Sequence, residues 1–224
     1  MKLFAKKLVT FPDPHMALED GIVDINDDLR IERLLEAYSF GIFPWPHPEL
    51  PTLWFSPDPR GVLDFENLHV PRSLHKLLDR GKFEYTFNRC FNLVIDACSK
   101  QPRPGQSGTW ITPRLLNAYK EFHKAGYAHS LEVWQDGELA GGLYGVYVGG
   151  VFCGESMFYL RPNASKAAVV RLVDFLQSHG LLWMDIQMVT PVLELLGGTY
   201  ISRADFLERL ELTKPTAQPI AFKF

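Results

Sequence analysis

Cysteine is scarce in this sequence, with three residues in 224. Cys90, Cys98 and Cys153 are too few for a disulfide framework and lack the paired spacing of a metal site, which is typical of a protein from a reducing compartment. The seven histidines include no H-x-x-x-H pair, so they form no helical metal motif. We therefore expect a cytoplasmic location and no bound metal ion.

Long apolar runs are also absent. No stretch approaches the roughly 20 residues needed to span a bilayer, and residues 1–7 contain no apolar core of the length found in secretory signals. The chain is 46% hydrophobic and 22% charged, which is typical of a globular protein. Its net charge of −3 does not indicate a nucleic-acid partner, so any such contact has to be local. We expect a monomer that does not associate with membranes.

Two apolar, strand-like segments carry polar groups. FCGESMF at 152–158 contains Glu155, and WMDIQ at 183–187 contains Asp185 and Gln187. A buried carboxylate loses its hydration, which costs several kcal/mol unless partners are supplied. Proteins usually keep such groups for chemistry or recognition, so we predict that neighbouring strands direct the three side chains into one cleft. The alternative from the residues alone is that the carboxylates form structural pairs with Arg or Lys.

The N-terminal part of the chain is rich in proline and aromatic residues. Up to residue 60 it reads as loops and short edges around one helix at 29–39, capped by Asp27 or Asp28. The pattern then predicts a helix at 71–79, a strand at 83–87 and a helix at 91–98. A polar Pro/Gly segment follows at 101–108. We expect a smaller, loop-rich α/β domain at 1–100, joined by 101–108 to a second domain at 109–224.

The second part has a regular order of elements. Thr112 and Pro113 open a helix that runs to residue 126. Asp136-Gly137 marks a hairpin between strands at 130–134 and 139–148, and a Gly-Gly turn leads to a third strand at 151–160. Ser165 then caps a helix that runs to residue 177, and a strand follows at 182–187. This α+β order resembles the core of the GCN5-related N-acetyltransferase fold.

Enzymes of that fold that use acyl-coenzyme A carry a glycine-rich loop whose amides hold the pyrophosphate at a helix N-terminus. The corresponding turn here is RPNASK at 161–166, which has no glycine. An acyl donor other than coenzyme A is therefore indicated.

Six motifs follow one another along the chain: GIFPW at 41–45, WFSPDPR at 54–60, GTWIT at 108–112, AHSLEVW at 128–134, FCGESMF at 152–158 and DIQ at 185–187. In sequence and in order they resemble the motifs of one family, the leucyl/phenylalanyl-tRNA–protein transferases. The resemblance implies transfer of leucine or phenylalanine from leucyl-tRNA or phenylalanyl-tRNA to proteins with N-terminal Arg or Lys. Such proteins are thereby tagged for N-end rule degradation. One departure is the stretch at 188–198, which has no histidine where the family usually carries one.

The chemistry needs no cofactor, because transfer from a tRNA ester to an amine is downhill. An α-amino group has a reference pKa of about 7.7–8.0, so the enzyme mainly positions a partly neutral amine and accepts a proton. By resemblance, Asp185 and Gln187 orient and activate the amine, while Glu155 holds polar groups around the reacting centre. The resemblance also implies an apolar pocket for the donor side chain, formed by Leu143, Phe152, Met157, Val169 and Met184. Core packing is the alternative for these five residues.

Two further groups are candidates for holding the tRNA. Trp45 and Trp110 stand in turns and could clamp the terminal adenosine by stacking, or else anchor loops to the core. Arg72, Lys76 and Arg80 follow helical spacing and form a basic stripe, which is otherwise a solvated face. Two other functions remain open, namely an acyltransferase of the same fold with a different donor or acceptor, and a non-catalytic tRNA- or peptide-binding module.

Overall fold

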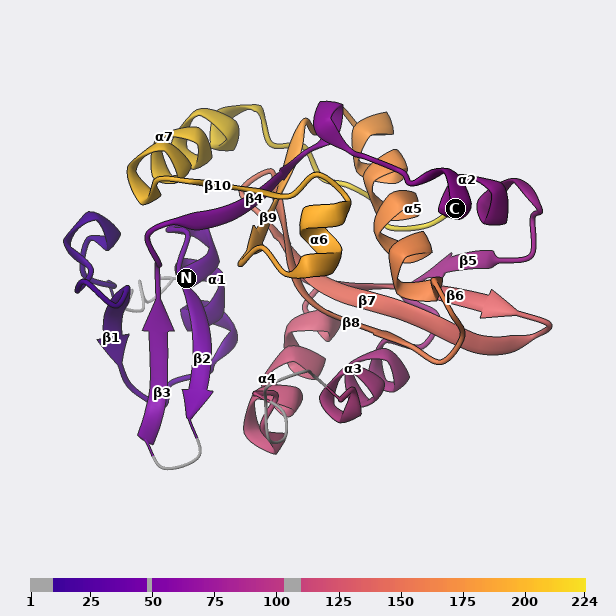
Figure 1. Cartoon of the computed structure of the whole chain (residues 1–224). Helices are drawn as coiled ribbons and strands as arrows, with labels where there is room; N and C mark the ends of the chain where they lie inside the picture. Colours follow the sequence, from indigo (N-terminus) through magenta and orange to yellow (C-terminus); the bar gives the residue numbers. More distant parts are fainter. Residues whose placement is uncertain (1–9, 48–49, 103–109) are drawn as a thin grey trace, which may run out of the picture.

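The computed structural model describes residues 10–47, 50–102 and 110–224, and these form two sheets flanked by helices (Figure 1). Most of the predicted connecting loop at 101–108 lies outside the described residues. The expected mixed α+β composition is confirmed. Within the described residues, no helix is both long and apolar enough to cross a membrane.

The smaller sheet is built from the N-terminal segment. Its antiparallel strands are β1 (Ile22–Ile25), β2 (Phe43–His47) and β3 (Leu50–Phe55), in the order β1-β3-β2. The expectation of loops and short edges was partly right, because β2 is a short edge strand although it contains Pro44 and Pro46. Among the described strands β2 pairs only with β3, so it is an edge strand, and an edge strand tolerates residues that cannot donate to a ladder.

The described part of the chain also forms a seven-stranded sheet in the order β10-β4-β9-β8-β7-β6-β5. Its β8 and β9 are parallel, and the other neighbouring pairs are antiparallel. The predicted hairpin turns at Asp136-Gly137 and Gly149-Gly150 are confirmed, with positive φ at all four residues. The strands are β4 (Arg60–Asp64), β5 (Glu84–Phe87), β6 (Ala128–Gln135), β7 (Glu138–Val148), β8 (Val151–Tyr159), β9 (Trp183–Gln187) and β10 (Thr199–Ile201).

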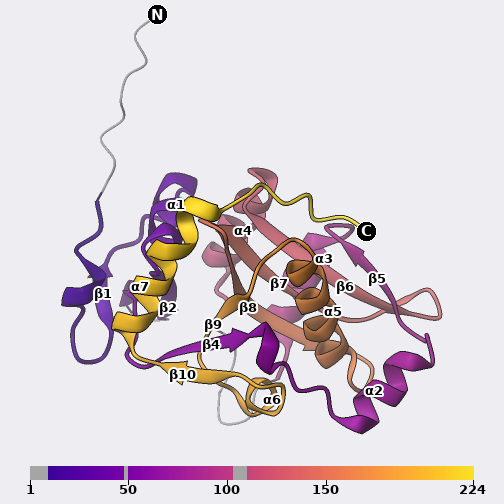
Figure 2. The ribbon, with the colours of Figure 1, turned by 90° about the horizontal axis from the view of Figure 1, so that it is seen from above.

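Helices cover both faces of this sheet. The helix α5 packs on one face with α2 beside it, whereas α1, α3, α4 and α7 contribute to the core on the other face (Figure 1). Figure 2 shows the small sheet and α7 at one end of the large sheet and α2 at the other. The helices are α1 (Ile31–Ser39), α2 (Arg72–Asp79), α3 (Phe91–Lys100), α4 (Pro113–Lys124), α5 (Ala164–Ser178), α6 (Pro191–Leu195) and α7 (Arg203–Thr213), with short 3₁₀ turns at Pro14–Met16, Phe65–Asn67 and Lys214–Thr216.

The predicted helix caps were partly right. Thr112 caps α4, accepting a hydrogen bond from the amide of Leu115 at 3.3 Å. Ser165 does not cap α5, because that helix begins one residue earlier and its N-cap position is Asn163. Asp27 does not cap α1 either; its carboxylate accepts the amide of Thr52 on β3 at 2.9 Å. The second candidate cap, Asp28, pairs instead with the neighbouring Arg30.

The strands β4 and β5 belong to the region predicted as an N-terminal domain, yet they lie in the same sheet as β6 to β10. The division at 101–108 stays a prediction, since most of that segment is outside the described residues.

A β-bulge on β8 places Glu155. Tyr144 pairs with Ser156 and Gly145 pairs with Gly154, so Glu155 is the extra residue that has no partner on β7. The bulge reverses the alternation of side chains along the strand, which is why Phe152 and Met157, five residues apart, both pack on the α5 side. The parallel ladder between β8 and β9 consists of one register pair, Cys153 opposite Asp185. Past the bulge, the two strands are therefore not paired with each other.

Glu132 on β6 is a fully buried carboxylate that joins three elements. It accepts hydrogen bonds from the hydroxyls of Ser130 and Thr86, both at 2.6 Å, and from the amides of Arg89 and Cys90, both at 3.3 Å. These amides precede α3, so Glu132 satisfies part of the N-terminus of that helix while it ties β5 to β6.

Replacing this carboxylate should destabilise the fold. We expect Glu132→Ala to lower the free energy of unfolding by about 3 kcal/mol, because it leaves several buried donors without an acceptor. Glu132→Gln should cost less, since its amide oxygen still accepts. Urea denaturation measures both, with the exposed Glu121→Ala on α4 as a control that should stay within about 0.5 kcal/mol of the wild type. An equally small loss for Glu132→Ala would contradict this role.

Candidate functional site

The three polar residues predicted on β8 and β9 meet in one hydrogen-bonded network. The side-chain amide of Gln187 donates to Glu155 Oε1 at 2.8 Å, and the backbone amide of Gln187 donates to Asp185 Oδ1 at 2.9 Å. All three are buried, with 8%, 0% and 4% of Glu155, Asp185 and Gln187 exposed. The structure thus brings the residues together, while their catalytic roles stay predictions.

Asp185 forms a buried ion pair with Arg60 at the start of β4. The guanidinium donates from Nε to Oδ1 at 2.9 Å and from Nη2 to Oδ2 at 2.7 Å, and its Nη1 donates to the carbonyl of Gly41 at 3.0 Å. It also lies over the rings of Phe43 and Phe206. The structural-pair alternative therefore holds for Asp185. Sequence reasoning missed this role of Arg60, whose partner is 125 positions away.

Glu155 has no such cation. Among the described residues its partners are Gln187 and two phenols, Tyr38 of α1 at 2.8 Å and Tyr119 of α4 at 3.0 Å. Burial raises the pKa of the Glu155 carboxyl from 4.5 to about 7, although the hydrogen bonds from Tyr38 and Tyr119 lower it. The site therefore contains one carboxylate in an ion pair and one held only by neutral donors. Neither tyrosine was predicted, since each lies on a helix whose pattern reads as ordinary core.

Gln187 ends β9 in a left-handed backbone conformation, with φ of 60°. This region is uncommon for residues other than glycine, and such outliers gather at functional sites. The conformation is held by the hydrogen bond from its amide to Asp185. The ion pair of Asp185 with Arg60 therefore determines where the Gln187 side chain points, and so supports its contact with Glu155.

Trp45 on β2 and Trp110 before α4 lie together, as a shared role requires. Their indole rings stack with centroids 5.2 Å apart and planes 7° from parallel. Rings in direct contact leave no room for a base between them, so the predicted clamp is closed in this conformation. Trp110 is 9% exposed and Trp45 is half-buried, which leaves Trp45 the more accessible ring.

The predicted donor-pocket residues share one core cluster on the α5 face of the sheet. A β-carbon at Gly154 would lie 3.1 Å from the Met184 Cε atom, so this side chain reaches across from β9 to β8. Met157 is half-buried and the others are buried, and core packing explains these positions as well as a pocket does. The cluster contains Leu143, Phe152, Met157, Val169 and Met184.

The basic stripe lies on α2, at the end of the sheet away from the small sheet (Figure 2). Arg72, Lys76 and Arg80 are exposed, and the opposite side of the helix packs inward through the buried Leu74. A carboxylate interrupts the exposed face, where Asp79 accepts a hydrogen bond from His75 at 2.9 Å.

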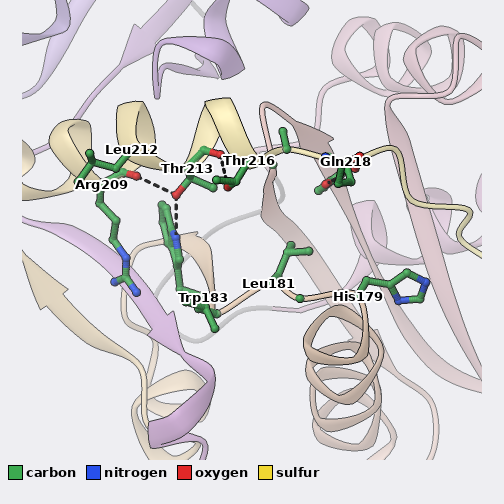
Figure 3. A pocket seen from close by; sticks show the side chains of 13 residues that line it. His179, Leu181, Trp183, Arg209, Leu212, Thr213, Thr216 and Gln218 are labelled. Atoms are coloured by element: carbon green, nitrogen blue, oxygen red, sulfur yellow. Dashed lines mark hydrogen bonds between the residues drawn. The ribbon is translucent and has the colours of Figure 1, made fainter.

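A cavity of about 290 Å³ lies apart from this network (Figure 3). It sits at the beginning of β9, where Trp183 lies under α7, whereas Gln187 ends the strand. Several of its polar side chains bond within the protein, as when the Trp183 indole donates to the Thr213 hydroxyl at 3.3 Å (Figure 3).

Other chemistries find little support in the structure. The described residues contain no cluster of His, Cys, Asp and Glu that could hold a metal ion. Burial raises the pKa of the Cys153 thiol, as expected for a small buried side chain rather than a nucleophile. Burial also lowers the pKa of His129 to about 4, and its ring stacks on Phe222, in keeping with a structural histidine.

Comparison with solved structures gives distant similarities. The L-PGS of Bacillus licheniformis matches with a TM-score of 0.42 and 11% identity, covering 71% of this chain and 51% of that one. An aminoglycoside acetyltransferase from an uncultured soil sample matches with a TM-score of 0.33 and 12% identity, covering 65% of this chain and 95% of that one. Similarities at this level carry no argument about the fold.

Comparison of sequences is decisive. Residues 27–58 match the family model of the leucyl/phenylalanyl-tRNA protein transferase N-terminal domain, and residues 62–211 match that of leucyl/phenylalanyl-tRNA protein transferase. The protein of that name from Anaeromyxobacter sp. (strain Fw109-5) is 49% identical over 93% of this chain and 89% of its own. The one from Myxococcus xanthus is 50% identical over 89% and 86%. The chain therefore belongs to the leucyl/phenylalanyl-tRNA–protein transferase family.

Proposed function

We propose that this aminoacyltransferase moves leucine or phenylalanine from its tRNA to the α-amino group of proteins that begin with Arg or Lys. Family membership gives the reaction class, an aminoacyl-tRNA donor and a protein acceptor. The observation that carries the proposal is the contact of Gln187 with Glu155, which unites the predicted catalytic groups of two distant motifs. We further propose that it acts as a cytoplasmic monomer and marks proteins for N-end rule degradation.

The network suits a reaction whose main demand is positioning. The incoming amine is partly neutral near its reference pKa of about 7.7–8.0, and it has to meet the ester carbonyl in the right orientation. In our proposal the Gln187 side chain holds the amine, and the ion-paired Asp185 fixes Gln187 through its backbone amide. Neither step requires a metal ion or a redox cofactor.

Recognition of the donor is assigned to two regions. The apolar side chain enters the cluster of Leu143, Met157 and Met184, beside the point where β8 and β9 stop pairing with each other. Methionine adapts to different shapes, which suits both leucine and phenylalanine. Because the two indoles are already stacked, the terminal adenine extends the stack on the outer face of Trp45.

We also propose that residues 109–224 form a GCN5-related N-acetyltransferase-like domain and residues 1–100 a smaller α/β domain. Support comes from the order of elements α4 to β9, from the bulge at Glu155 and from the parallel pair of β8 and β9. The strands separate where the reacting groups are proposed to lie, so the fold itself opens the site.

A transfer assay tests the function. With radiolabelled leucyl-tRNA, we expect label to enter a peptide that begins with Arg and one that begins with Lys, but not a matched peptide that begins with Ala. Phenylalanyl-tRNA should serve as donor, and lysyl-tRNA should fail because its charged side chain would lose water in an apolar pocket. Equal labelling of the Ala peptide, or transfer from lysyl-tRNA, would overturn the assigned specificity.

Gln187→Ala and Asp185→Asn should slow the transfer step and leave binding of the charged tRNA nearly intact. The loss should be about 100-fold or more, as expected when groups that orient a reactant are removed. Asp185→Asn also leaves Arg60 without a counter-charge, so its unfolding free energy should fall. Single-turnover rates, filter binding and urea denaturation separate the three effects. Wild-type rates in both variants would remove these residues from the mechanism.

The basic stripe on α2 should contact phosphates rather than bases. Replacing Arg72, Lys76 and Arg80 with alanine should weaken different charged tRNAs about equally. It should also reduce the salt dependence of binding, by about one unit of log–log slope for each phosphate that the variant no longer neutralises. A triple alanine variant of three other exposed cations, Arg30, Lys124 and Arg161, serves as a charge-matched control. Equal slopes in the two variants would identify the stripe as a solvated face.

A further inference from the structure

Three contacts close a ring of oxygen atoms around the Glu155 carboxyl group. Tyr38 contacts Oε1 at 2.8 Å, Tyr119 contacts Oε2 at 3.0 Å, and the two phenol oxygens also form a hydrogen bond with each other. Both tyrosines are buried, with 3% and 0% exposed. The ring thus joins α1, α4 and the bulge of β8 away from bulk water.

The number of protons in this ring depends on the state of Glu155. Each phenol has one proton to donate, so an ionised carboxylate leaves two protons for three contacts. A protonated carboxyl adds a third proton, and the hydrogen bonds can then run around the ring, from Glu155 to Tyr119, from Tyr119 to Tyr38 and from Tyr38 back to Glu155. The arrangement can therefore hold both forms of Glu155.

Asp185 differs from Glu155 in having a charged partner. Its oxygens accept two hydrogen bonds from the Arg60 guanidinium and one from the Gln187 amide, so a cation already balances its charge. Glu155 accepts three from the described residues, so one position at Oε2 remains for a reactant.

The groups around Glu155 come from several elements. They are Tyr38 of α1, Tyr119 of α4, Cys153 of β8, and Asp185 and Gln187 of β9. Behind them lie the guanidinium of Arg60 on β4 and the phenol of Tyr144 on β7, whose ring contacts Tyr119. The charges of Asp185 and Arg60 offset each other. What remains is burial, which keeps the carboxyl poised near neutrality, where a group both accepts and returns a proton efficiently.

From this geometry we propose that Glu155 carries the proton of the transfer reaction, and that Tyr38 and Tyr119 are its positioning residues. The inference rests on the proposed aminoacyl transfer. The neutral amine attacks the ester carbonyl, and Glu155 accepts a proton from the nitrogen as the C–N bond forms. As the C–O bond breaks, Glu155 gives that proton to the departing ribose oxygen. The products are an amide and a free ribose hydroxyl, and the Glu155 carboxylate is restored.

The test is the pH dependence of single-turnover transfer from leucyl-tRNA to an Arg peptide, at saturating concentrations between about pH 5.5 and 9. The wild-type rate should rise with pH in two steps, one near the pKa of about 7 of Glu155 and one from the amine. Glu155→Gln should lower the rate at least 100-fold, within the usual range for a lost proton-transfer group, and remove the first step. Asp185→Asn should also lower the transfer rate, but its pH profile should keep the first step.

Tyr38→Phe and Tyr119→Phe test the ring itself and remain informative if Glu155→Gln does not fold. Each removes a donor to the carboxylate, so the first step should move to higher pH. Tyr147→Phe is the matched control, because its phenol bonds to the Gln218 carbonyl outside the site, and its profile should not change. An unmoved step in both variants, or loss of the first step in Asp185→Asn, would overturn the proposal.

Difference infrared spectroscopy gives a readout that does not depend on activity. A band from a protonated carboxyl should disappear as pH rises through about 7 in the wild type and be missing in Glu155→Gln. If no aminoacyl-tRNA supports transfer while this band titrates as expected, the proposed function fails and the proton-holding ring stands. If transfer occurs but no such band titrates, the inference about Glu155 fails and the proposed function stands.

Discussion

The buried ion pair of Arg60 and Asp185 is the interaction on which the site depends. It links β4 to β9, and through the carbonyl of Gly41 it also ties the segment that leads into β2. Burying two charges costs several kcal/mol for each ion, and the pair offsets this only with good geometry and further hydrogen bonds. Here the contact is bidentate, a third donor satisfies Asp185 and aromatic rings cover the guanidinium. The elements that carry the pair are thereby held in one relative position.

The consequences of that pair extend through the backbone. Asp185 accepts the amide of Gln187 and so stabilises a left-handed residue at the end of β9, which aims the Gln187 side chain at Glu155. The bulge on β8 delivers Glu155 to the same point from the neighbouring strand. The left-handed residue at the end of β9 and the bulge on β8 thus meet where the parallel ladder between these two strands ends. The two irregularities are tolerable because a network of satisfied hydrogen bonds holds them.

How much of the fold and the site could be predicted depends on how far apart in the sequence the interacting residues lie. Local turn chemistry is strong, so Asp136-Gly137 and the Thr112 cap were confirmed. The proline-rich segment of β2 was expected to form loops and short edges, and which of the two it forms depends on its pairing with β3. Glu155, Asp185 and Gln187 could be found because polar groups stand out in apolar runs. Arg60, Tyr38 and Tyr119 could not, since each matters through a contact at least 36 positions away.

The division of labour that we propose for the two carboxylates rests on their surroundings rather than on their type. Asp185 and Glu155 stand on adjacent strands, and Gln187 touches both. A guanidinium donates two hydrogen bonds to the first carboxylate and balances its charge. The second carboxylate is buried among neutral donors, and this burial raises its pKa to about 7. Two acidic groups placed in different environments can take different roles in one reaction. In this protein the difference arises because Arg60 reaches one strand and not the other.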